Sequence, residues 1–474
     1  LEGSVRWEKR GTGPDRIRVT PQLIRVSDDR HLWADRYDAD LADIFQVQGS
    51  IAERVTDALN VALGGSERAA LGAQPTNIPA AYDYYLRGLE YERNRGADGI
   101  RRAVEMYQKA VTLDPGFALG FARLAKVHAL LYWFHRDRSD ARLALSKQAA
   151  DSALRLSPTL PEGHIAMGLY HYWGHLNYEA ALKEFSIAQA RRPNDSELLY
   201  ATGLVQRRQG RWREAMASLG RASELSPRAL DFNIELAGTA FVTRDWATVE
   251  RTVNRLLAFH PDKVEGYELK AFLAILAQGD TAAASAALRD GLAQSDSAQL
   301  LATYPAYLLK RDPALGPAFD RVSVAAFFGD SGAYYSWRAW LELRTGERPS
   351  EGVYWDSLRA FAERRTAARP NDATYHIQLG AAYAGLGRKS EAIHEGRKGL
   401  ELVPPSRDAL AHFQKVWDFA RILVTVGDHD AAIDQIEYLG TIPSWFTRNG
   451  FRYFPEWEPL HSNPRFQRVV AGMK

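Results

Sequence analysis

The sequence contains no cysteine, which excludes disulfides, thiolate catalysis and cysteine-ligated zinc. It has no apolar run of about 18 residues, so we expect no membrane span in this chain. An excess of one charge is also missing, because 60 basic residues stand against 58 acidic ones, and this balance predicts no nucleic-acid partner. A signal peptide and an initiator Met are absent as well, so Leu1 is interpreted as a cut point within a longer polypeptide.

What the sequence does contain is a repeated spacing. Four small or helix-ending residues are separated by 7, 5 and 12 positions in both 199–227 and 379–404. They are Gly203, Gly210, Ala215 and Pro227 in the first stretch, and Gly380, Gly387, Ala392 and Pro404 in the second. Two antiparallel helices approach closely only where a side chain is small, and proline cannot continue a helix. Each stretch is therefore predicted to be a helix pair joined by a turn.

Prolines mark the ends of further copies. Pro158, Pro193, Pro227 and Pro261 follow one another at intervals of 35, 34 and 34 residues, and Pro370 to Pro404 is 34 again. This pattern resembles the tetratricopeptide repeat (TPR), a helix pair of about 34 residues. The resemblance implies a mainly α fold, a TPR-type α-solenoid, in which helix pairs form a right-handed superhelix and neighbouring pairs share one core.

The first 63 residues differ in kind. Residues 1–8, 16–26 and 31–37 are predicted strands, and the apolar spacing from Asp43 to Leu63 predicts a helix. The segments LEGSVR, RIRVTPQLI, HLWADRYDADLADIFQVQ and IAERV resemble the second half of a TolB-like module. In bacteria that module commonly precedes TPR arrays in receptor-type serine/threonine kinases, adenylate/guanylate cyclases and winged-helix regulators. The resemblance implies a small, incomplete α/β module ahead of the solenoid.

The predicted domain organisation has five parts. They are the C-terminal half of a TolB-like module (1–63), a linker (64–79), regular TPR repeats (80–261), degenerate helical repeats (262–369), and TPR repeats with a C-terminal cap (370–474). The degenerate part spans about three repeat lengths. Its closing proline spacing is lost, although helical periodicity persists.

Candidate chemistry is sparse. His164, His171 and His175 share a helical face and could bind Zn²⁺ or Ni²⁺, but packing within a repeat is the favoured interpretation. The stretch GLGRKS at 385–390 lacks the order of a phosphate-binding loop and is interpreted as a turn. Asp428 and Asp430 are interpreted as residues at a helix start. We therefore predict no catalytic residue, no cofactor and no metal.

A binding surface remains as the functional candidate. In a TPR superhelix the first helix of each pair lines the concave face, which takes peptides or partner helices. The candidate partner-binding residues on that face are Tyr172, Tyr200, Arg207, Arg208 and Phe241. Aromatic and Arg side chains are the types that anchor interfaces.

The sequence thus predicts a non-catalytic interaction and sensory module of a multidomain bacterial signalling protein, with a protein or peptide partner. The C-terminal pattern is most similar to the kinase-linked TPR proteins, then to the cyclases, then to the winged-helix regulators. A stand-alone assembly scaffold, and an enzyme or metal-binding protein with an unrecognised site, are the alternatives. Oligomeric state and compartment, cytoplasmic or periplasmic, stay open.

Overall fold

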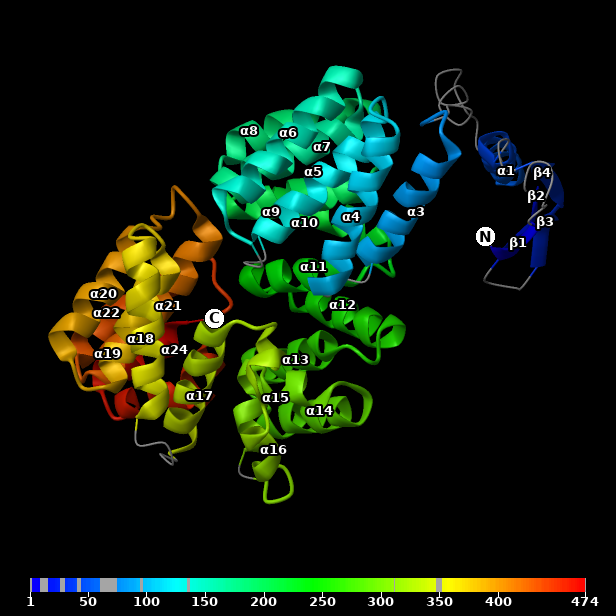
Figure 1. The fold of residues 1–474 in the computed structure, drawn as a ribbon. Helices are drawn as coiled ribbons and strands as arrows, with labels where there is room; N and C mark the ends of the chain where they lie inside the picture. The colour runs from blue at the N-terminus through cyan, green and yellow to red at the C-terminus, as the bar shows by residue number, and fades with distance from the viewer. Residues whose placement is uncertain are drawn as a thin grey trace. The chain divides into compact units, whose positions relative to one another are not determined.

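The computed structural model describes residues 2–8, 16–25, 30–40, 44–59, 75–93, 97–133, 137–310, 312–346 and 352–473 (Figure 1). The chain divides into two compact units, Leu1–Arg191 and Arg192–Lys474. Each unit has a hydrophobic core of its own. No helix within the described ranges is long and apolar enough to cross a bilayer.

The first unit begins with a small antiparallel sheet and one helix. The elements are β1 (Glu2–Glu8), β2 (Arg16–Arg25), β3 (Arg30–Ala34), β4 (Tyr37–Asp40) and α1 (Ile44–Ala58). Strand β2 is central, with β1 on one edge and both β3 and β4 on the other. Ile17 and Leu23 of β2 and Val47 of α1 are buried. Apolar residues that alternate along β2 therefore form the small core under the helix.

The predicted strands and helix are confirmed, with one difference in the third strand. It is interrupted at Asp35 and Arg36, so β3 and β4 are two halves of one edge. Pro21 has no N–H to donate to this edge, and its carbonyl accepts from the Asp35 N–H (3.1 Å). The Arg36 N–H donates to the Asp35 carboxylate (2.8 Å) rather than to a strand. The connection at 9–15, the predicted helix end at 60–63 and residues 64–74 of the predicted linker lie outside the described residues.

Helix pairs make up the rest of the first unit. They are α3 (Pro79–Arg93) with α4 (Ala97–Leu113), α5 (Ala118–Trp133) with α6 (Asp140–Leu156), and α7 (Pro161–Leu169) with α8 (Tyr178–Arg191). Helix α7 continues as a single π turn, η2 (Tyr170–Gly174). Tyr107 of α4 and Phe117, in the connection to α5, are fully buried in a core that also contains Leu124 of α5, so neighbouring pairs share one interior.

The second unit continues the same architecture. Its first pairs are α9 (Ser196–Arg208) with α10 (Trp212–Leu225), α11 (Leu230–Thr243) with α12 (Trp246–Phe259), and α13 (Val264–Leu273) with α14 (Thr281–Gln294). Helix α13 also ends in a π turn, η3 (Ala274–Gln278). The later pairs are α17 (Ser331–Thr345) with α18 (Val353–Ala368), α19 (Ala373–Gly385) with α20 (Lys389–Glu401), and α21 (Ala409–Thr425) with α22 (His429–Thr441). The fold is a TPR-type α-solenoid, as predicted.

The region of degenerate repeats differs from the expected three helix pairs. Between α14 and α17 the chain forms only short helices: α15 (Ser297–Leu301), η4 (Tyr304–Leu309), α16 (Gly316–Asp320) and η5 (Val324–Phe327). Pro305 and Pro317 stand at the starts of η4 and α16, where a longer preceding helix would have needed their N–H groups. The pairs α13–α14 and α17–α18, with an irregular insert between them, therefore stand where three regular repeats were expected.

The chain ends in three short helices. They are α23 (Arg448–Tyr453), η6 (Pro455–Leu460) and α24 (Pro464–Gly472). Helix α24 packs against α22, the second helix of the last pair.

Close approach of paired helices explains the repeated glycines. A Cβ atom on Gly380 of α19 would lie 2.8 Å from the backbone N of Gly396 and 3.0 Å from the carbonyl O of Ala392 in α20. A Cβ on Gly203 would lie 2.7 Å from the Leu219 side chain. Ala215, predicted to lie at a crossing, is fully buried. Small residues at these offsets are thus required by the helix-to-helix distance.

The closing prolines carry a recurrent hydrogen bond. In four repeats the proline carbonyl accepts a hydrogen bond from the side chain six residues later. The pairs are His164 with Pro158 (3.0 Å), Asn233 with Pro227 (3.0 Å), Tyr267 with Pro261 (2.9 Å) and His376 with Pro370 (2.8 Å). A carbonyl near a helix C-terminus lacks an intrahelical partner, so the next first helix supplies one.

His128 is a buried titratable group inside the first unit. It lies on α5, and its Nδ1 is 2.9 Å from Nη1 of Arg142 on α6. Only 3% of the residue is exposed. Burial, reinforced by the positive charge of Arg142, lowers the pKa of His128 to about 4. The neutral imidazole therefore accepts the Arg142 hydrogen bond.

We expect Gly380→Ala to lower the free energy of unfolding by about 1–3 kcal/mol, because the added methyl meets backbone atoms of α20. Gly220 of α10 is the matched control, since a Cβ there has nothing within 4 Å. Gly220→Ala should raise stability by about 0.5–1 kcal/mol through helix propensity. Urea denaturation of both variants measures the difference, and equal effects of the two substitutions would contradict the assigned crossing.

We also expect a pH-dependent loss of stability that disappears in His128→Asn. The pKa is lower in the folded state, so the unfolded state takes up the proton first as the pH falls. Stability is fully present above about pH 6.5 and declines towards pH 4, where the loss reaches about 3 kcal/mol. Denaturation of both proteins at pH 7 and near pH 4.5 tests this. Parallel losses in the two proteins would show that other groups cause the decline.

Candidate partner-binding surface

Residues 442–460, which we name the C-terminal segment, lie across the first helices of the second unit. At the end of α11, Nη2 of Arg244 donates to the carbonyl of Phe446 (2.8 Å), and Arg244 itself adopts a left-handed φ of 57°. At η4, the Tyr307 hydroxyl donates to the carbonyl of Tyr453 (3.2 Å). Helix α23 packs on η3, and η6 packs on α17 and α21. The chain's own C-terminal segment therefore covers much of the face that the first helices form.

The π turn η3 provides an anchor for this segment. The Thr447 hydroxyl donates to the carbonyl of Leu276 (2.8 Å), and Nδ2 of Asn449 donates to the same oxygen (3.3 Å). In a regular α-helix the Leu276 carbonyl would accept from the N–H of Asp280, but that N–H bonds to Ala274. The local widening thus frees one carbonyl for a long-range contact.

Aromatic packing holds the segment in place. The rings of Trp417 on α21 and Phe446 are stacked, with centroids 3.6 Å apart and planes 4° apart. The Trp457 ring lies 4.7 Å from Trp417, and Trp457 is fully buried. Phe451 and Phe454 are also buried. This interior is part of the main core of the second unit.

A buried carboxylate lies at the centre of the contact. Glu456 Oε2 is 3.4 Å from Nε of Arg344 on α17, and Oε1 is 3.4 Å from Nε of Arg421 on α21. The Tyr304 hydroxyl donates to Oε1 as well. Burial opposes ionisation of Glu456, but Arg344 and Arg421 outweigh it and lower its pKa. Burial raises the pKa of Tyr304 well above its usual value, so this hydroxyl stays a donor.

Beside the C-terminal segment, an open groove of about 160 Å³ remains on α17, α19 and α21. These are the first helices of three consecutive pairs. The groove is lined by Ser336 and Trp340 from α17, by Thr374, Ile377, Gln378 and Ala381 from α19, and by Lys415, Asp418 and Arg421 from α21. Within each helix the residues recur at three- or four-residue intervals, so each helix contributes one face. We name these nine residues the inner groove.

Arg421 connects the inner groove with the buried carboxylate. Its guanidinium carbon lies 3.5 Å from the centroid of the Trp340 ring. Nη1 is 3.6 Å from Asp418, which also lies 3.8 Å from Lys415. Burial and the nearby charge of Arg344 lower the pKa of Arg421. The Arg421 guanidinium thus lies between the carboxylates of Asp418 and Glu456, and its plane covers the Trp340 indole.

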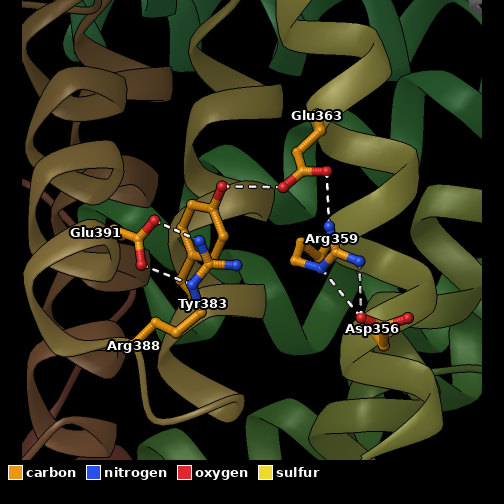
Figure 2. Close-up of polar contacts among 6 residues, drawn as sticks. All are labelled: Asp356, Arg359, Glu363, Tyr383, Arg388 and Glu391. Carbon is orange, nitrogen blue, oxygen red and sulfur yellow. Dashed lines mark hydrogen bonds and ion pairs between the residues drawn. The ribbon is translucent and has the colours of Figure 1, made fainter.

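A polar network on the neighbouring helices fixes the position of α19 (Figure 2). The Tyr383 hydroxyl of α19 donates to Glu363 of α18 (3.1 Å). Arg359 lies between Glu363 (2.8 Å) and Asp356 (2.9 Å) on the same helix. Figure 2 also shows Arg388 beside the Tyr383 ring, with 4.2 Å between the guanidinium carbon and the ring centroid. The helix α19 supplies four of the residues that line the inner groove. By holding α19 against α18, this network also positions these four residues.

None of the five residues predicted to bind a partner lines the inner groove. Tyr172 lies in the first unit and Phe241 in the second, and they are 1% and 3% exposed. Both side chains fill helix-pair interiors, which corrects the expectation that they face a groove. In an α-helix successive side chains differ in direction by about 100°. A one-residue error in the predicted phase is therefore enough to assign a buried side chain to the surface.

The other three predicted residues take part in packing or ion pairs of the second unit. The Tyr200 ring stacks on Phe232 (centroids 4.6 Å apart). Arg207 is 7% exposed and pairs with Glu235 (2.5 Å). Arg208 pairs with Asp408, which N-caps α21, at 2.8 Å. The Arg208–Asp408 ion pair joins residues that are 200 positions apart in the sequence. Partner binding by Tyr200, Arg207 and Arg208 stays a prediction.

The remaining sequence candidates have structural explanations. Both ring nitrogens of His164 are engaged, Nδ1 with Glu184 (2.7 Å) and Nε2 with the Pro158 carbonyl. His175 Nε2 contacts the Tyr170 hydroxyl (2.8 Å). Across the described ranges no group of three His, Asp or Glu side chains is arranged to hold a metal ion. Residues 385–390 span the end of α19, the turn at 386–388 and the start of α20, and Asp428 occupies the N-cap position of α22.

Sequence reasoning missed Trp340, Arg421 and Glu456. A signal was present, because Arg421 interrupts the apolar run of α21 and Glu456 stands among the aromatic residues of 451–457. A charged residue inside an apolar stretch is rarely buried without a partner. The partner of each lies far away in the sequence, however, and only the fold identifies it.

Comparison with known proteins gives one relative by sequence. The protein named "Putative adenylate cyclase 3" of Rhizobium meliloti (strain 1021) is 31% identical over 179 residues, which are 36% of this chain and 29% of that protein. The chain therefore matches less than a third of the length of this relative. No protein-family model matches the chain.

Among solved structures, the chain is similar to PilF of Pseudomonas aeruginosa (18% identity, 45% of this chain and 91% of that chain, TM-score 0.35). It is also similar to a TPR protein from Parabacteroides merdae ATCC 43184 (17%, 52% and 91%, TM-score 0.34). A third similarity is to human IFIT1 (14%, 76% and 82%, TM-score 0.41).

We expect Glu456→Gln to lower the free energy of unfolding by about 3–5 kcal/mol, because it leaves Arg344 and Arg421 buried without their carboxylate. The control is Glu391→Gln, which removes an exposed pair with Arg388 and should leave stability unchanged within error. Chemical denaturation measures both. A stable Glu456→Gln protein would mean that the C-terminal segment does not depend on this ion-pair network.

Proposed function

We propose that this chain is a non-catalytic interaction module that binds an extended segment of a protein partner in the inner groove. The observation that carries the proposal is the position of the groove on three consecutive first helices, α17, α19 and α21. Its lining combines apolar side chains with hydroxyl, amide and charged groups, which suits a peptide that presents both side chains and backbone.

The C-terminal segment supports this proposal by example. It is a non-repetitive stretch held by side-chain bonds to its carbonyls, from Arg244 at the end of the first helix α11 to Phe446 and from Tyr307 of η4 to Tyr453. It also supplies buried aromatic anchors such as Phe446. A partner segment would use the same types of contact where the C-terminal segment leaves the helices uncovered.

We further propose that the module belongs to a multidomain signalling protein. The partial similarity to a protein named as an adenylate cyclase supports a cyclase as the output domain, ahead of the kinase that the C-terminal pattern favoured. The TolB-like resemblance of residues 1–63 agrees with that setting. In this proposal the chemistry resides in the output domain, and the helical repeats receive the partner.

The test is selection from a display library of random short peptides on the full chain. We expect enriched peptides whose binding is lost in Thr374→Trp, because Thr374 is exposed and the larger side chain fills the groove. Ser390→Trp is the matched control, since Ser390 is exposed at the start of α20, outside the groove. Isothermal titration of synthesised peptides gives the affinities.

Two outcomes would contradict the proposal. One is that no peptide is enriched over the naked support. The other is that the enriched peptides bind Thr374→Trp and Ser390→Trp equally well, which would place binding elsewhere on the chain. Circular dichroism of both variants must match the parent for either result to count.

A further inference from the structure

The guanidinium of Arg421 is buried with donor capacity to spare. The residue is 7% exposed, and among the described residues its Nη2 has no hydrogen-bond partner. Its contacts to Glu456 (3.4 Å) and Asp418 (3.6 Å) are ion pairs longer than good hydrogen bonds. A buried donor without an acceptor is unfavourable, so an acceptor supplied by a ligand would be stabilising.

The charges around Arg421 do not balance. Lys415, Asp418 and Arg421 line the inner groove, Glu456 pairs with Arg421, and Arg344 is the second partner of Glu456. These five groups are three cations and two carboxylates. One positive charge is therefore uncompensated. Lys415 is 14% exposed and Arg421 8% by side chain, so water screens this charge only in part.

The geometry favours a planar anion with a single charge. Trp340 covers one face of the Arg421 guanidinium, and Nε and Nη1 face Glu456 and Asp418, so Nη2 is the donor left for a ligand. A carboxylate is planar, accepts a hydrogen bond from such a donor and carries the one negative charge that is missing. A phosphate dianion would leave an excess negative charge in a partly buried groove. Ile377 and Ala381 supply apolar surface for the methylene groups of an acidic side chain.

We propose that the inner groove recognises an Asp or Glu side chain of the partner, with Arg421 and Lys415 as the residues that bind its carboxylate. This inference rests on the proposed function and specifies its ligand chemistry. Asp418 opposes this binding, because its carboxylate already pairs with Lys415 and Arg421 and so lowers their affinity for an acidic segment. The carboxylate of Glu456 holds the other side of Arg421 in position.

Substitutions at Asp418 and Lys415 test the assignment in opposite directions. Asp418→Asn removes a competing carboxylate and should tighten binding of an acidic peptide about tenfold. Lys415→Gln should weaken it by a similar factor. Lys389→Gln is the matched control, with the same change of charge at an exposed site on α20. Arg421 is left intact, because its replacement would also disturb Glu456.

The probes are short alanine peptides with one central residue, Glu, Gln or phosphoserine, titrated calorimetrically into the full chain. We expect the Glu peptide to bind, the Gln peptide to bind at least tenfold more weakly, and the three variants to behave as stated. Equal binding of the Glu and Gln peptides, or an unchanged affinity in both Asp418→Asn and Lys415→Gln, would overturn the proposal. Tighter binding of the phosphoserine peptide would also overturn it, in favour of a phosphate ligand.

The result is separable from that of the peptide selection. If selected peptides bind in a manner sensitive to Thr374→Trp but carry no acidic residue at a fixed position, the interaction module stands and the carboxylate assignment fails. If the Glu peptide binds as expected but its binding is insensitive to Thr374→Trp, the acidic site lies outside the inner groove and the carboxylate assignment fails, whereas the interaction module is judged by the selected peptides.

Discussion

One buried carboxylate between two guanidinium groups determines the inner face of the second unit. Glu456 could not be buried without Arg344 and Arg421, and neither arginine could be buried without it, since an isolated interior charge is strongly unfavourable. A buried ion pair contributes little net stability compared with apolar packing of the same volume. What it provides here is a specific position for the C-terminal segment, because a shifted register would leave three charges unpaired.

That arrangement depends in turn on the distance between paired helices. Gly380 lies against the backbone of α20, and Gly203 lies against Leu219, so the pairs are too close for any larger residue at the crossing. A short interhelical distance gives each pair a nearly constant shape, and repeated pairs then stack into a continuous core. First helices fall on one side as a consequence, and α17, α19 and α21 become neighbours although they span about ninety residues of sequence.

The solenoid could be predicted from sequence because its determinants are local. Gly203 with Gly210 and Gly380 with Gly387 repeat at one spacing, and both turn glycines adopt a left-handed φ, 74° and 75°. The irregular insert between α14 and α17 was harder to predict, because Pro305 and Pro317 interrupt the helical pattern there and no repeated spacing replaces it. The inner groove could not be predicted, because Glu456 lies 112 residues from Arg344 and its pairing reflects tertiary structure alone. Tyr172 and Phe241 failed as surface predictions for a related reason: periodicity identifies a helix with more certainty than it identifies which side is buried.

An occupied inner face changes what a partner can do. A solenoid with an open concave surface can hold a long segment along many repeats, but here the C-terminal segment already uses Arg244, the Leu276 carbonyl and Tyr307. In the proposed binding mode a second chain would meet α17, α19 and α21 of the second unit, with one uncompensated positive charge beside an indole. Such a contact is short, so its affinity would be modest and its selectivity would come from charge. The same guanidinium serves both the internal carboxylate and the groove, which makes the docking of the C-terminal segment a precondition for the recognition of an acidic partner.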